Sequence, residues 1–143
     1  MSKLLKRSKG FTLIELVIVI AIAALILAAV LFAVIGAQSS RRDAQRKTDA
    51  GTISSYIQQA ASNYSGALPS TAGGEAAATF NTNYITNNNL KDPSTGAAYT
   101  PTFATGTACP AWTAAGTVTI EINGRSYIVC MDLESKDTFS TKG

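Results

Sequence analysis

The chain consists of one long apolar segment near its start and a far more polar remainder. Across residues 11–35 the only charged side chain is Glu15, and Thr12 is the only other clearly polar one. At 1.5 Å per residue, a helix over 11–35 would be about 37 Å long, enough to cross a hydrocarbon core of about 30 Å with tilt. The pattern therefore predicts a transmembrane helix, too long for a cleaved secretory signal.

A second helical pattern continues directly from the apolar segment. Apolar residues recur there at steps of three and four, which gives a helix one apolar stripe. The stripe consists of Ala50, Ile53, Ile57, Ala60, Ala61 and Tyr64. No proline occurs before Pro69, so we predict one long helix, with an apolar half over 11–35 and an amphipathic continuation over 36–66.

The alternation of residues near the C-terminus predicts a β-hairpin. Residues 117–122 and 125–131 are β-rich runs joined by Asn123-Gly124, the pair that favours a type I′ turn. A two-residue turn at this pair sets Ile122 opposite Arg125 and Ile120 opposite Tyr127. One face then carries Val118, Ile120, Ile122, Tyr127 and Val129, and the other carries Thr117, Thr119, Glu121, Ile128 and Cys130.

The apolar face of the hairpin needs a cover, and the amphipathic helix is the only long partner available. We therefore predict an α+β fold, in which a small antiparallel sheet packs on the second half of a helical spine. The predicted contact between helix and sheet involves Ile53, Ile57, Val118, Ile120, Tyr127 and Val129. The head would extend over residues 67–143. Within it, residues 70–116 are expected to be irregular, with short strands near Tyr99 and Phe103 as an open alternative.

Charge changes this picture only at the N-terminus. The formal net charge is +3, but Lys3, Lys6, Arg7 and Lys9 lie in the first ten residues. Residues 11–143 carry eight basic against nine acidic residues. A basic head before an apolar span keeps to the cytoplasmic side, which sends the rest of the chain outward. A general nucleic-acid footprint is therefore unsupported.

The junction between head and span carries a specific motif. Lys9-Gly10-Phe11-Thr12-Leu13-Ile14-Glu15, followed by the apolar run, resembles the class III signal of type IV pilins and of the pseudopilins of type II secretion. The resemblance implies that prepilin peptidase removes the leader 1–10 by cutting after Gly10, and that the new N-terminal Phe11 is methylated. It also implies that the 11–35 helices of many subunits bundle into a filament core.

Glu15 has a physical reason to take part in that assembly. A carboxylate inside an apolar membrane helix costs about 2.5–3.5 kcal/mol or more at the bilayer centre, so it calls for a partner. The amine of Phe11 on a neighbouring subunit would supply the counter-charge. The pairing would favour transfer from membrane lipid into the fibre and would help set the axial register.

The resemblance extends more weakly into the polar part. Residues 91–99 are similar to an Asp-Pro-x-x-Gly-x-x-Tyr loop of pseudopilins and related pilins, with a simple turn as the alternative. Cys109 and Cys130 would form a disulfide if this part is exported. They resemble the pair that closes the C-terminal loop of many pilins. Such a bridge would pin residues 109–116 across the outer face of the sheet.

For several other polar and aromatic residues, the sequence allows more than one role. Histidine is absent, and we find no catalytic constellation, no metal site and no cofactor site, so an enzyme is not expected. Calcium binding or a solvated acidic tail are the alternatives for Asp132, Glu134 and Asp137. Lipid, DNA or subunit contacts are the alternatives to a solvated helix for Arg41, Arg42, Arg46 and Lys47. Trp112 and Tyr99 are expected to pack rather than to act as adhesive surface residues.

Three functions fit these observations. The first is a type IV pilus subunit for adhesion, surface motility or DNA uptake. It would move from the cytoplasmic membrane to an extracellular filament with the help of an assembly platform and a motor ATPase. The second is a pseudopilin of a secretion or competence pseudopilus. The third is a single-span anchor that displays a binding domain and is not cleaved after Gly10.

Overall fold

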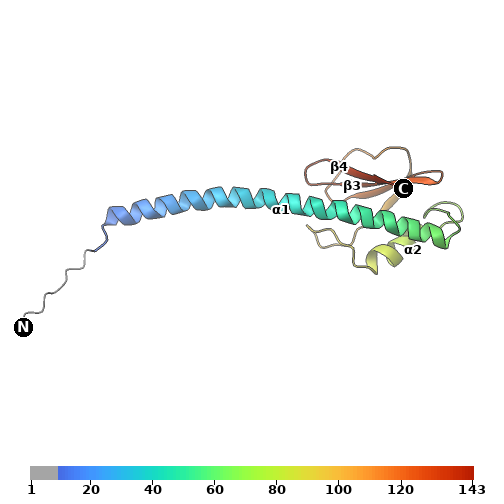
Figure 1. Ribbon diagram of the computed structural model, residues 1–143, viewed down its shortest axis with the longest axis horizontal. Coiled ribbons are helices and arrows are strands. Elements are labelled where there is room, and N and C mark those ends of the chain that lie inside the picture. Colours follow the sequence, from blue (N-terminus) through green and yellow to red (C-terminus); the bar gives the residue numbers. More distant parts are fainter. Residues whose placement is uncertain (1–9) are drawn as a thin grey trace, which may run out of the picture. The chain divides into compact units, whose positions relative to one another are not determined.

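The computed structural model describes residues 10–143, so the predicted basic leader lies outside the described residues except for Gly10. The elements in chain order are helix α1 (Leu13–Asn63), helix α2 (Ala77–Phe80), a π-helical turn η1 (Asn81–Thr86), and strands β1 (Thr102–Thr105), β2 (Val118–Asn123), β3 (Ser126–Asp132) and β4 (Thr138–Lys142) (Figure 1). The predicted α+β class is confirmed. The chain divides into two compact units, one up to Ala37 and one over Gln38–Gly143, and α1 contributes to both.

Helix α1 ends close to the predicted position. Ser65 adopts a left-handed conformation with φ 54°, and the amide of Gly66 donates to the carbonyl of Ala61 over 2.7 Å. This 6→1 bond is the one that closes a Schellman motif. The helix therefore stops at Asn63, and Tyr64, which we predicted to extend the apolar stripe, lies beyond it with 40% of its surface exposed.

The four strands form one sheet in the order β1-β2-β3-β4. Strands β2, β3 and β4 pair antiparallel, but β1 pairs parallel to β2. The sheet is therefore mixed rather than purely antiparallel as predicted. The pair is parallel because the connection between Gly106 and Thr117 carries the chain back along the sheet before β2 starts.

The hairpin between β2 and β3 has a different register from the predicted one. Ile122 pairs with Tyr127 and Asn123 pairs with Ser126, so the two turn residues are Gly124 and Arg125. Gly124 has φ 64°, whereas Arg125 is not among the residues with positive φ. A glycine at the first turn position fits a type II′ turn, which glycine alone adopts easily there. The shift moves every partner by two positions and so keeps each side chain on its predicted face.

One apolar core joins α1 to the sheet. It includes all six residues predicted to make this contact, and each of them is buried. The full cluster consists of Ala50, Ile53, Ile57, Ala60, Leu68, Phe80, Ile85, Tyr99, Val118, Ile120, Ile122, Tyr127, Val129, Met131 and Leu133. Burial of such side chains contributes about 1.5–3 kcal/mol each. This core therefore explains why the amphipathic half of α1 is helical in the first place.

The segment between α1 and the sheet is more ordered than predicted. Helix α2 and η1 place Phe80 and Ile85 in the core, and the ring of Phe80 meets the ring of Phe103 of β1 edge-on with centroids 5.6 Å apart. Figure 1 shows α2 on one side of α1 and strands β3 and β4 on the other. The aromatic contacts let the two sides share one core, which sequence periodicity did not reveal.

The outer face of the sheet is partly covered by the segment before β2. Cys109 and Cys130 form a disulfide. The indole of Trp112 donates to the carbonyl of Leu133 over 2.8 Å, and the amide of Thr113 donates to the carboxylate of Asp132 over the same distance. The bridge and these bonds hold this segment against the end of β3. The half-buried Trp112 is thus a packing residue.

Candidate assembly site

The predicted processing point lies in extended chain just before α1. Gly10 has no atom within 4 Å of the place where a side chain would begin, and Phe11 has 87% of its surface exposed. Neither residue belongs to a helix or strand. A peptidase would therefore meet an accessible main chain at the Gly10–Phe11 bond. The cleavage itself and the methylation of Phe11 remain predictions.

Glu15 is tied to Thr12 by a reciprocal set of hydrogen bonds. The amide and the hydroxyl of Thr12 each donate to the Glu15 carboxylate over 2.9 Å, and the amide of Glu15 donates back to the Thr12 hydroxyl over 3.3 Å. This is a capping box, in which an N-cap threonine and a glutamate three residues later satisfy each other's free donors. The spacing Thr-x-x-Glu before an apolar run is the recognised sequence signal of this box, although no capping role was predicted for Glu15.

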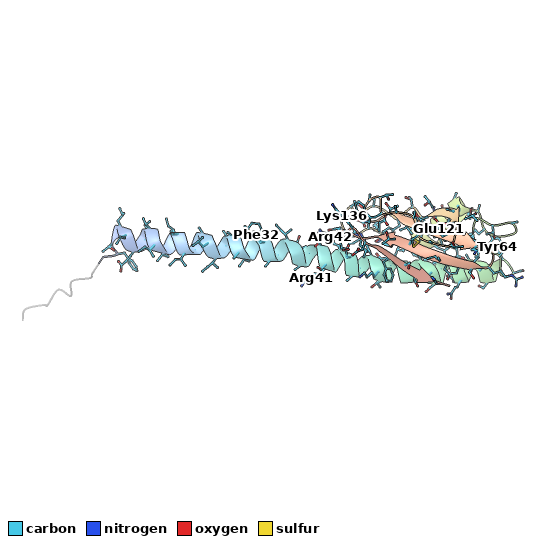
Figure 2. All side chains as sticks on the ribbon, turned by 90° about the horizontal axis from the view of Figure 1, so that it is seen from above. Phe32, Arg41, Arg42, Tyr64, Glu121 and Lys136 are labelled. Atoms are coloured by element: carbon cyan, nitrogen blue, oxygen red, sulfur yellow. A yellow bond between two sulfur atoms is a disulfide. The ribbon has the colours of Figure 1, made fainter. Side chains whose placement is uncertain are left out.

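The apolar half of α1 buries almost none of its large side chains. Exposed residues in it are Leu13, Ile14, Leu16, Val17, Ile18, Val19, Ile20, Ile22, Leu25, Ile26, Leu27, Val30, Leu31, Phe32, Val34 and Ile35, and Phe32 projects freely in Figure 2. Within residues 10–143, α1 is the one helix that is long and apolar enough to cross a membrane. So large an apolar surface needs lipid or other helices around it.

A buried ionic cluster connects the polar half of α1 to two distant loops. Arg46 is fully buried, and its guanidinium lies 2.7 Å from Asp92, 3.0 Å from Asp43 and 3.1 Å from Glu134. The adjacent Arg42 forms a bidentate pair with Glu134, with contacts of 2.7 and 2.8 Å. The sequence shows the charge of these two arginines but not their partners Asp92 and Glu134, which lie 46 to 92 residues away along the chain. Both arginines therefore pack within the folded head of the same chain and do not lie on a solvated helix face.

Asp92 and Asp43 complete this cluster with main-chain bonds. The amides of Ser94 and Thr95 donate to Asp92 over 2.9 and 3.0 Å, so the Asp-Pro loop is a turn closed by its own aspartate. The amides of Glu134 and Ser135 donate to Asp43. The cluster therefore fastens the 92–96 loop and the 133–135 turn to the same stretch of helix.

The electrostatics of the cluster favour its charged forms. Burial raises the pKa of Asp92, but the Arg46 guanidinium and the donors of Ser94 and Thr95 outweigh it and hold that pKa well below its usual range. Burial lowers the pKa of Arg46, and its bonds to Asp92 and Glu134 reverse this and raise the pKa. The Arg42 guanidinium lowers the pKa of Glu134. All these groups are therefore charged at neutral pH.

Of the remaining residues considered from the sequence, some are buried in the head and the others are exposed. Asp132 is buried and accepts hydrogen bonds from Thr113 and from the hydroxyl of Thr138, whereas Asp137 is exposed. No group of three or more His, Cys, Asp or Glu side chains within residues 10–143 is arranged to hold a metal ion. The Tyr99 hydroxyl donates to Asp49 over 3.0 Å in the core. Lys47 lies 5.9 Å from the ring centre of Phe139, and Arg41 is exposed.

The comparison with known proteins finds a match at the start of the chain. Residues 5–31 match the family model of the prokaryotic N-terminal methylation motif. No curated protein and no solved structure matches the chain. A class III signal of this kind implies processing by prepilin peptidase and polymerisation in general, and it marks structural proteins that are usually not enzymes. The methylation motif and the long apolar helix that continues from it fit the type IV pilin-like family, as a pilin or a pseudopilin.

Proposed function

We propose that the chain is the structural subunit of a type IV pilus filament. It would be cut after Gly10, methylated at Phe11 and polymerised through residues 11–35. The observation that carries this proposal is the apolar surface of α1, which is exposed from Leu13 to Ile35. In the membrane, lipid covers this surface. In a bundle of helices the same surface would be buried by copies of itself, which makes polymerisation a second way to remove it from water.

We also propose that assembly requires other proteins of the cell and that the filament is displayed outside it. The subunits would leave the cytoplasmic membrane through an assembly platform driven by a motor ATPase and would be displayed outside the cell. The disulfide between Cys109 and Cys130 supports display in an oxidising environment, because such bonds persist there and are rare in the cytosol. The filament would serve adhesion, surface motility or DNA uptake.

A pseudopilin is the second candidate, and the Asp92 loop is the observation that favours it. This loop resembles one common in pseudopilins, and here Asp92 bonds to Arg46 over 2.7 Å. The two candidates differ in where the mature protein accumulates.

The test is intact-mass measurement and N-terminal sequencing of protein sheared from the surface of the native host, compared with its membrane fraction. We expect abundant sheared material that begins at methylated Phe11 and has both thiols oxidised. The same processed chain found only in membranes would favour the pseudopilin. A chain that keeps its basic leader would overturn both and leave a simple membrane anchor.

A further inference from the structure

The outer face of the sheet carries a shallow depression. It has a volume of about 300 Å³ and lies at the hairpin end of β2 and β3, beside the start of the connection that follows β1. Its lining includes Gly106, Thr107, Glu121, Ile128 and Lys142. A depression of this size is at the lower end of the range for sites that hold small molecules, about 300–1,000 Å³.

Glu121 lines this depression, and the contacts of the fold described above give its carboxylate no structural role. Figure 2 shows it on the sheet, and only 7% of its surface is exposed. No hydrogen bond or ion pair reaches its carboxylate from any residue in the described range 10–143. Within residues 10–143, the buried side-chain atoms without a hydrogen-bond partner are Glu75 Oε2 and Asn81 Oδ1, so the Glu121 carboxylate is open to solvent through the depression. It is the negative group that a cationic ligand could reach there without breaking an existing ion pair.

Gly106 makes room for this carboxylate. A Cβ atom added at position 106 would clash with the Glu121 carboxylate. Gly106 is also held in place, since its amide donates to the carbonyl of Ile122 over 3.2 Å. The main chain at Gly106 therefore lies close to the Glu121 carboxylate at the wall of the depression.

The opposite side of the depression carries a positive charge. Glu121 is the partner of Ile128 across β2 and β3, and Ile128 is the partner of Lys142 across β3 and β4. The three side chains thus form a row across the outer face, with about 9–10 Å between the outer two Cα atoms. Glu121 and Lys142 form no salt bridge. The row presents a carboxylate, an apolar middle and an ammonium group.

We propose that this depression binds a small zwitterion with an aliphatic chain between its charges. The ligand's ammonium group would pair with Glu121, its methylene groups would lie on Ile128, and its carboxylate would pair with Lys142. Such a ligand satisfies Glu121 without bringing an unpaired charge into the depression. The site depends on the folded head alone and does not rest on the proposed filament function.

The experiment is an NMR titration of the full processed chain in detergent micelles with 6-aminohexanoate. Butylamine and butyrate are the matched probes that carry only one of the two charges. We expect saturable shifts of the amides of Glu121, Ile128 and Lys142 with 6-aminohexanoate, and binding about tenfold weaker for either single-charge probe, because each lacks one charge-assisted hydrogen bond.

Two variants and a control complete the design. Glu121→Gln and Lys142→Gln are each expected to weaken 6-aminohexanoate binding about tenfold. Lys136→Gln changes an exposed lysine outside the depression and is expected to leave binding unchanged. Unchanged amide shifts away from the depression show that each variant is folded. Absence of saturable shifts in the parent chain, equal binding of butylamine, or unchanged binding in Glu121→Gln would overturn the proposal.

Discussion

Among single residues, Arg46 makes the most demanding set of interactions. It is fully buried and faces three carboxylates from the helix, the 92–96 loop and the 133–135 turn. A buried cation is tolerated only because these partners compensate its lost hydration. The same arrangement leaves buried negative charge behind when the arginine is removed.

We therefore predict that Arg46→Met strongly destabilises the head. Removing one partner of a buried ion pair costs about 3–5 kcal/mol, so the free energy of unfolding should fall by that amount. Denaturant unfolding in detergent micelles, followed through Trp112 fluorescence, measures it. The matched control is Arg41→Met, which removes an exposed arginine and should change stability by no more than about 0.5 kcal/mol. Equal stability of the two variants would contradict the prediction.

Asp92 makes the stability of the head depend on pH. The native state holds its pKa well below the usual range, whereas an unfolded aspartate titrates near pH 3.9. A carboxyl with a lowered native pKa contributes stability that is complete above the unfolded pKa and is lost as pH falls toward the native one. Asp43 and Glu134 have lowered pKa values and act in the same direction.

The corresponding variant is Asp92→Asn. We expect it to be less stable than the parent chain at pH 7, and we expect the difference to shrink as the pH falls below about 5. Unfolding midpoints measured from pH 7 to pH 2 for both chains test this. Asp137→Asn, at an exposed position, is the control and should follow the parent at every pH. A constant difference between Asp92→Asn and the parent would exclude the electrostatic origin.

At the scale of elements, the connection that crosses the outer face of the sheet depends on the disulfide. Cys109 and Cys130 are 21 residues apart, and a closed loop of that length stabilises by about 3 kcal/mol in the chain-entropy model. We predict that the double variant Cys109→Ser/Cys130→Ser loses about this much stability in denaturant unfolding. A reductant should produce the same loss in the parent chain and no further loss in the variant. An additional loss in the variant would point to another cause.

The regular elements were largely predictable because their periodicity is strong. Ile53 and Ile57 follow the helical period, and the alternation from Val118 to Val129 fixes which side chains face the core. The register was not predictable, because both Asn123-Gly124 and Gly124-Arg125 can occupy a two-residue turn. The observed shift by two positions keeps the same faces, so periodicity alone does not distinguish the registers.

The remaining elements depend on partners far away in the sequence. Strand β1 is four residues long, and its parallel partner β2 begins only after a long connection. A short strand near Phe103 was one alternative in the sequence analysis and is present as β1, but the sequence there has no alternation strong enough to decide for it. Arg46 stands in a run of charged helix residues, and its burial is determined only when the Asp92 loop and the 133–135 turn fold back. The Thr12–Glu15 box, by contrast, was readable from four residues.

For the whole molecule, the main question is what Glu15 contributes to polymerisation. In the single chain its carboxylate already accepts two hydrogen bonds from Thr12. These hydrogen bonds hold the carboxylate in place, but its negative charge still lies inside an apolar segment. The capping role and the charge are therefore separate contributions, and three substitutions can distinguish them.

Glu15→Gln removes the charge and keeps a side chain that can form a capping box. Thr12→Ala removes the cap, at about 1 kcal/mol, and keeps the charge. Glu15→Ala removes both. If the charge drives assembly, Glu15→Gln and Glu15→Ala should insert and be cleaved normally but yield little sheared filament, while Thr12→Ala should assemble. The measurement is the ratio of processed chain in sheared and membrane fractions. Normal filaments from Glu15→Gln would exclude the counter-charge between subunits, and poor assembly of Thr12→Ala would then assign the requirement to the capping box.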